Sequence, residues 1–137
     1  MPGMDAASGL ADLRRAEALL PKSLYAVDAK LTGASPVTDV AQLTSLAFAA
    51  VAVGRGHVLD TSHVIFPNGA ITLVLILAES HLSIHTWPEE DLIAIDLFSC
   101  GAIDGEAVIS GLTQSLRLDA VSVRRLSRGV SPGEPAE

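Results

Sequence analysis

Four residues within one short stretch have side chains or positions that suit chemistry. Ser80 follows Glu79 at the end of an apolar run, His85 lies five residues further on, and Cys100 comes just before a glycine. A serine or cysteine beside an imidazole supports nucleophilic and acid–base chemistry. We expect these four residues to converge at one strained turn. By spacing alone they also fit a plain structural hairpin, with Cys100 as a small buried hydrophobe.

The elements that position these residues are predicted from periodicity and turn signals. Alternating apolar and polar residues predict strands over 82–87 and 92–100, with a turn over 88–91 between them. Antiparallel pairing outward from this turn brings Cys100 or its neighbour beside Ser80.

The rest of the chain completes a small mixed fold. Its predicted elements are a strand over 23–31, a helix over 40–53 between the N-cap Asp39 and Gly54, strands over 57–66 and 70–79, a helix over 104–116 and a strand over 120–126. This order predicts an α/β chain of the α+β type. Its architecture is a two-layer sandwich, with a mainly antiparallel sheet and two helices on one face. Strand 70–79 is apolar at nearly every position, which predicts burial on both faces.

The domain organisation follows from length and composition. The chain of 137 residues predicts one domain, over 23–128, after an N-terminal tail over 1–22 that holds a short helix over 11–20. Residues 129–137 are predicted to be a disordered tail.

Charge and composition exclude several classes of function. A formal net charge of −7 argues against nucleic acid as a partner. No apolar stretch is long enough to span a membrane, and no signal peptide is evident, so a cytoplasmic location is expected. The single cysteine allows no internal disulfide. Four histidines and one cysteine at these spacings match no common zinc pattern, so no metal is expected.

Two sequence motifs resemble one known family. ESHLSIHTWPE at 79–89, together with AIDLFSCG at 94–101, closely resembles the bacterial and archaeal S-adenosylmethionine decarboxylase proenzymes. The resemblance implies a pyruvoyl-dependent enzyme that cleaves itself between Glu79 and Ser80. The products would be a β chain of residues 1–79 and an α chain of residues 80–137. Family members assemble as (αβ)2 homodimers with stacked sheets.

The resemblance also implies a role for each motif residue. Ser80 attacks the carbonyl of Glu79 and is converted to the pyruvoyl group, which forms a Schiff base with the substrate and acts as an electron sink. His85 matches the residue that transfers protons during processing, for which an imidazole is suited. Cys100 matches the proton donor of decarboxylation, and a thiol is mostly protonated at neutral pH.

The substrate side departs from the family pattern. Phe66 is the best candidate to stack on adenine, and Thr72, with a one-residue shift, stands in for a family serine. Glu89, in the acidic run before Leu92, is either part of a solvated turn or a ligand for a cationic amine. Despite these departures, the resemblance implies S-adenosylmethionine as the substrate, for spermidine synthesis. The alternatives are L-ornithine or L-arginine, giving putrescine or agmatine, and a non-catalytic α/β binding module.

Overall fold

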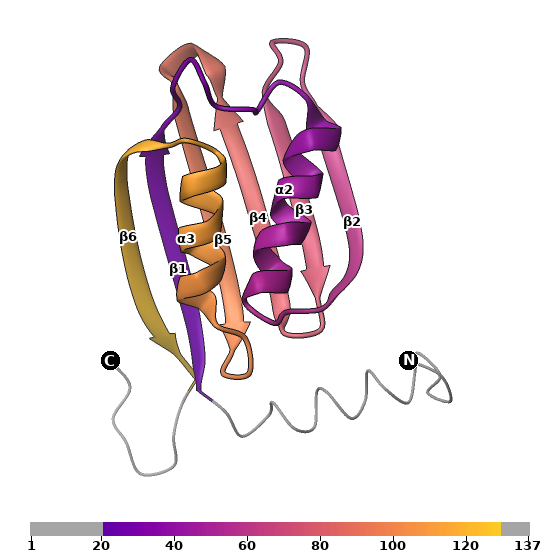
Figure 1. Ribbon diagram of the computed structural model, residues 1–137, viewed down its shortest axis with the longest axis vertical. Helices are drawn as coiled ribbons and strands as arrows, with labels where there is room; N and C mark the ends of the chain where they lie inside the picture. Colours follow the sequence, from indigo (N-terminus) through magenta and orange to yellow (C-terminus); the bar gives the residue numbers. More distant parts are fainter. Residues whose placement is uncertain (1–20, 130–137) are drawn as a thin grey trace.

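The computed structural model describes residues 21–129 as one antiparallel sheet with two α-helices (Figure 1). Its elements are β1 (Lys22–Lys30), α2 (Val40–Val53), β2 (Val58–Ile65), β3 (Ile71–Leu77), β4 (Ser80–Trp87), the 3-10 helix η1 (Pro88–Glu90), β5 (Leu92–Cys100), α3 (Gly105–Ser115) and β6 (Asp119–Arg128). The predicted element order is confirmed. The tails predicted over 1–22 and 129–137, with the short helix over 11–20, fall outside the described residues except at their inner ends.

The sheet has six strands in the order β2-β3-β4-β5-β1-β6, and every neighbouring pair is antiparallel. The β4–β5 pair starts at Trp87 opposite Leu92 and runs outward to Ser80 opposite Ser99. The predicted hairpin register is therefore confirmed, and it places Cys100 one residue beyond the partner of Ser80.

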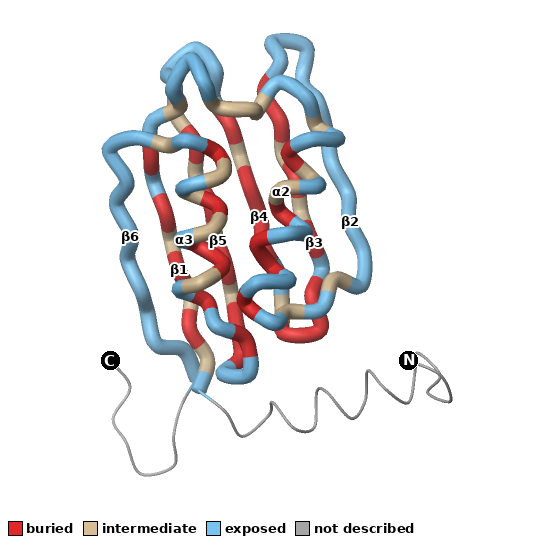
Figure 2. Tube along the Cα trace, viewed as in Figure 1, coloured by how far each residue is buried: buried red, intermediate tan, exposed pale blue. Residues whose placement is uncertain are grey.

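Both helices lie on the same face of the sheet and cover its central strands (Figure 1). Helix α2 begins after Asp39, whose carboxylate accepts hydrogen bonds from the amides of Ala41 and Gln42 at 2.9 and 3.3 Å. These bonds satisfy amides that have no partner within the helix. The core lies between the helices and the sheet, where alternate strand residues are buried (Figure 2). They include Leu73, Leu75, Leu82, Ile84, Ile93, Ile95 and Leu97.

The other face of the sheet carries apolar residues that nothing in the described chain covers. On β3, Ile76 is 47% exposed, although Leu75 and Leu77 on either side of it are buried. The prediction that this strand is buried on both faces is wrong for the single chain, because both helices pack on one face only. An uncovered apolar face of this kind is typical of a protein–protein contact.

Candidate active site

The peptide between Glu79 and Ser80 lies in a tight turn between β3 and β4. Leu77 pairs with Ser80, so only Ala78 and Glu79 form the loop. Two-residue hairpin loops normally use residues with positive φ, most often glycine or asparagine. Here the positive φ falls instead on Ser80, at +137°. A residue with a side chain is disfavoured in that region, so backbone strain is located at Ser80 itself.

The carbonyl of the same peptide is held from the neighbouring strand. The amide N–H of Cys100 donates to the carbonyl oxygen of Glu79 at 3.2 Å. Cys100 is a free cysteine and only 3% exposed. An amide donor aimed at a carbonyl stabilises the negative charge that develops on the oxygen when the carbon is attacked. The turn therefore combines a serine hydroxyl, a strained peptide and an amide N–H that donates to the carbonyl oxygen of that peptide.

The side chain of Glu79 is buried and bound by a residue that the sequence had not singled out for this site. Glu79 is 1% exposed. Its Oε1 accepts from the amide of His57 at 2.8 Å, and its Oε2 lies 2.6 Å from the ring Nδ1 of His57. The signal that points to such a partner is the position of Glu79 at the end of a buried strand, because a buried carboxylate requires donors.

His85 does not join the turn. It lies on the same strand as Ser80, five residues further along, and pairs with Thr72 and Ala94. At about 3.3 Å per residue the two Cα atoms are separated by about 17 Å. The expectation that His85 converges with the other three residues is therefore wrong within a single chain, because an extended strand carries it to the opposite end.

His85 instead lines a cavity of about 530 Å³ with all three predicted substrate-binding residues, Phe66, Thr72 and Glu89. The Thr72 hydroxyl lies 3.2 Å from the His85 Nδ1, and the two residues are direct partners across β3 and β4. Trp87 also lines the cavity, with its ring centroid 6.2 Å from that of His85.

The acidic residue of this cavity already has a partner. Asn68 donates its side-chain amide to Glu89 Oε2 at 3.2 Å. Asn68 and Glu89 both line the cavity, so its rim carries a hydrogen-bonded carboxylate beside aromatic rings. Such surroundings suit a cation, because the aromatic rings and the carboxylate attract its charge.

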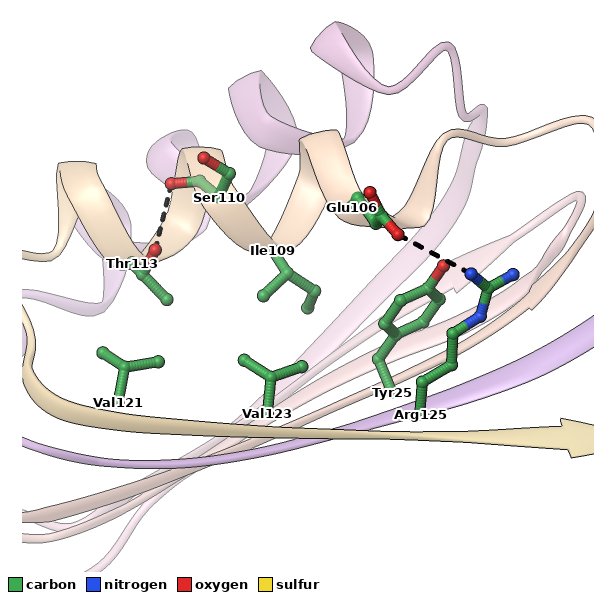
Figure 3. Close-up of a pocket in the computed structure, with 8 residues that line it drawn as sticks. All are labelled: Tyr25, Glu106, Ile109, Ser110, Thr113, Val121, Val123 and Arg125. Carbon is green, nitrogen blue, oxygen red and sulfur yellow. Dashed lines mark hydrogen bonds and ion pairs between the residues drawn. The ribbon is translucent and has the colours of Figure 1, made fainter.

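A second cavity lies on the helix side of the sheet, between α3 and β6, and does not include these residues (Figure 3). It measures about 370 Å³. At one end the Arg125 guanidinium lies over the Tyr25 ring and 3.6 Å from the Glu106 carboxylate. Burial raises the pKa of the Tyr25 hydroxyl above its ordinary value, and Arg125 opposes that shift.

No three metal-ligating side chains gather anywhere among residues 21–129. In the same part of the chain, no helix is long and apolar enough to cross a membrane. The open sheet face and its turn carry hydroxyl, thiol, imidazole and carboxylate groups. A strained Glu-Ser peptide with a hydrogen-bond donor on its carbonyl oxygen favours attack on that carbonyl by the serine hydroxyl.

Comparison with known proteins assigns the chain to a family. Residues 23–129 match the family model described as S-adenosylmethionine decarboxylase. The chain therefore belongs to the S-adenosylmethionine decarboxylase family. It is 36% identical to the S-adenosylmethionine decarboxylase proenzyme of Thermoplasma volcanium over 80% of this chain and 82% of that protein.

Other relatives match over a shorter length. The S-adenosylmethionine decarboxylase proenzyme 2 of Bacillus anthracis is 39% identical over 54% of this chain, and the match spans 61% of that relative's length. The crystal structure of the adenosylmethionine decarboxylase from Aquifex aeolicus aligns with a TM-score of 0.70 at 22% identity, covering 86% of this chain and 98% of that one. This likeness confirms the predicted fold.

Proposed function

We propose that this protein is a self-processing, pyruvoyl-dependent decarboxylase that acts on S-adenosylmethionine in spermidine synthesis. The observation that carries the proposal is the Glu79–Ser80 peptide, which has φ of +137° at Ser80 and the Cys100 amide on its carbonyl oxygen. We place the reaction in the cytoplasm, where the thiol that the proposed chemistry needs stays reduced.

Maturation begins with the Ser80 hydroxyl. Its Oγ attacks the carbonyl carbon of Glu79, the C–N bond breaks, and the peptide becomes an ester with a free amine on residue 80. A base then removes the Cα proton, and the Cβ–Oγ bond breaks with the Glu79 carboxylate as leaving group. Water hydrolyses the resulting dehydroalanine and releases ammonia, leaving a pyruvoyl group at residue 80. Cleavage also removes the strained φ torsion, since residue 80 no longer has a preceding peptide bond.

The surroundings of residue 80 fit a pyruvoyl group. A carbonyl at this position supplies an electron sink for the loss of carbon dioxide from an α-amino acid. Cys100, one residue beyond the strand partner of Ser80, is the donor that we assign to protonation of the product carbon. Cys100 is buried, so its thiol is shielded from bulk water.

The separation between Ser80 and His85 supports a homodimer of processed protomers, (αβ)2. The two residues are at opposite ends of one strand, and His85 belongs to the uncovered face. If two sheets stack on that face about a two-fold axis that reverses the strand direction, His85 of the second copy lies over Ser80 of the first. The same stacking covers exposed apolar residues such as Ile76.

The cavity beside His85 supports S-adenosylmethionine as the substrate. Phe66 is 45% exposed and Trp87 37% exposed, so both rings are open to stacking. Adenine stacks on aromatic rings, and a sulfonium cation is attracted to them and to the Glu89 carboxylate. Glu89 Oε2 accepts one hydrogen bond from Asn68, which holds the carboxylate beside these rings.

Release of carbon dioxide by the purified, full-length protein tests the substrate. S-adenosylmethionine, L-ornithine and L-arginine are offered separately, with the Ser80→Ala variant as the inactive control. We expect release from S-adenosylmethionine alone. Release only from a basic amino acid would contradict the proposed substrate but keep the proposed chemistry. No release from any of the three, by protein that has cleaved itself, would contradict the decarboxylase.

A further inference from the structure

The buried carboxylate of Glu79 is bound at both of its oxygens by one residue. His57 lies just before β2, and its backbone amide donates to Oε1 at 2.8 Å. Its ring Nδ1 lies 2.6 Å from Oε2. An ionised carboxylate accepts hydrogen bonds but does not donate them, so it binds an imidazole ring that carries a proton on Nδ1. His57 therefore binds both oxygens of this carboxylate, one through its backbone amide and one through its ring.

Backbone hydrogen bonds fix His57 in place relative to the turn and to α2. The carbonyl oxygen of His57 accepts from the amide of Ala78 at 2.9 Å, so His57 contacts both residues of the turn. The preceding Gly56 donates to Val51 at the end of α2 at 2.8 Å. A Cβ atom at Gly56 would come within 2.7 Å of Val51 and Ile103 side chains, which shows how closely this segment packs.

The side chain of Glu79 and the carbonyl carbon of the scissile peptide are attached to the same Cα atom. The carbonyl oxygen is held at 3.2 Å by the Cys100 amide. The carbon that Ser80 attacks is thus fixed from two directions, by His57 through the side chain and by Cys100 at the oxygen. A misplacement of about 1 Å in such a geometry can cost about a hundredfold in rate.

We propose that His57 is a positioning residue for self-cleavage, which orients the Glu79 carbonyl toward Ser80 by holding the Glu79 carboxylate through its ring Nδ1. The inference rests on the proposed self-cleavage at Ser80 and adds a residue outside the family-like motifs. His57 is half-exposed, with 58% of its side chain accessible, so its ring can be replaced with little loss of packing.

The test compares two replacements of similar shape. His57→Asn keeps a polar N–H at the position of Nδ1, whereas His57→Leu places a methyl group there. Thr61→Leu, on the exposed strand β2, is the matched control, since it makes the same polar-to-leucine change at an exposed site. Full-length precursor is synthesised in a cell-free system, and the appearance of the two chains is followed by denaturing gel and mass.

We expect His57→Leu to slow cleavage by about tenfold or more and His57→Asn to stay within about threefold of the native rate. Thr61→Leu should cleave at the native rate. Cleavage of His57→Leu at the native rate, while the native chain cleaves, would overturn the inference and leave the proposed function intact. Equal slowing by both replacements would overturn it too, because the N–H would then not matter. A native chain that never cleaves would overturn both proposals.

A double-mutant cycle removes the ambiguity that a less stable variant would introduce. His57→Leu is combined with Glu79→Ala, which removes the carboxylate that His57 holds. If His57 acts through Glu79, its replacement should change the cleavage rate less than about twofold in the Glu79→Ala background. A loss as large as in the native background would overturn the inference, because His57 would then act on the fold and not through Glu79.

Discussion

The amide N–H of Cys100 donates to the carbonyl oxygen of Glu79 at 3.2 Å, and the thiol of the same residue is buried beside the turn that holds Ser80. Backbone and side chain of one residue thus offer two separate functions. In the proposed mechanism, the amide stabilises negative charge on the oxygen during self-cleavage, and the thiol donates the proton after decarboxylation. Substitution of the side chain separates the two functions, because any residue except proline keeps the amide.

Cys100→Ala is expected to cleave itself at a rate close to that of the native chain and then to fail in decarboxylation. Loss of a positioned proton donor typically costs about a hundredfold or more in rate. Cleavage is measured by denaturing gel and turnover by carbon dioxide release. Normal turnover by the cleaved variant would remove Cys100 from the donor role.

Strain at Ser80 predicts an unusual order of stability between two precursors that cannot cleave. Glycine adopts a φ of +137° without steric cost, whereas alanine pays about 1–3 kcal/mol there. Glycine loses part of this advantage through its more flexible unfolded state. We expect Ser80→Gly to be more stable to urea than Ser80→Ala by about 1 kcal/mol.

The control for this comparison is Ser83, which lies on the same strand and is not among the residues with positive φ. In the Ser80→Ala background, Ser83→Gly should be less stable than Ser83→Ala, since glycine weakens a regular strand. The same order at both positions would show that the backbone at Ser80 is not strained.

The contact between Thr72 and His85 predicts a rescue by a conservative change. Thr72→Val keeps the shape but removes the hydroxyl that lies 3.2 Å from Nδ1. We expect self-cleavage to slow roughly three- to tenfold, as for the loss of one hydrogen bond, and Thr72→Ser to restore most of the rate. If the valine variant cleaves as fast as the native chain, the hydroxyl does not orient the imidazole.

The proposed dimer predicts complementation between two defective chains. His85→Ala and Cys100→Ala are each expected to be nearly inactive in decarboxylation. Co-expression forms mixed dimers with one complete site, in which the His85→Ala chain supplies Ser80 and Cys100 and its partner supplies His85. Random pairing then restores about a quarter of native activity. Activity no higher than that of either variant alone would contradict a site shared between copies.

Local signals predicted much of the fold. Helix α2 has the bounds expected from the sequence, because Asp39 caps its amides and Gly54 permits close packing. A Cβ atom at Gly54 would lie 2.5 Å from a Val108 methyl group. The hairpin register also followed from the turn at Pro88, since the first pair of a tight hairpin determines the rest.

The site was harder to predict, because its contacts join residues that are distant in sequence. The contact between His57 and Glu79 joins residues that are 22 positions apart in sequence. It depends on how the start of β2 packs beside the end of β3. The predicted convergence of Ser80 and His85 is wrong for a different reason. Closeness in sequence suggested closeness in space, but a strand extends by about 3.3 Å for each residue.

Denaturing intact mass of the freshly purified native protein tests the central claim most directly. The account predicts two chains, one ending at Glu79 and one starting at residue 80, with the second lighter by one ammonia than simple hydrolysis of the peptide would give. The Ser80→Ala variant should give one full-length chain. A single full-length species of the native protein, in fresh lysate as well as after prolonged incubation, would contradict self-cleavage at Ser80.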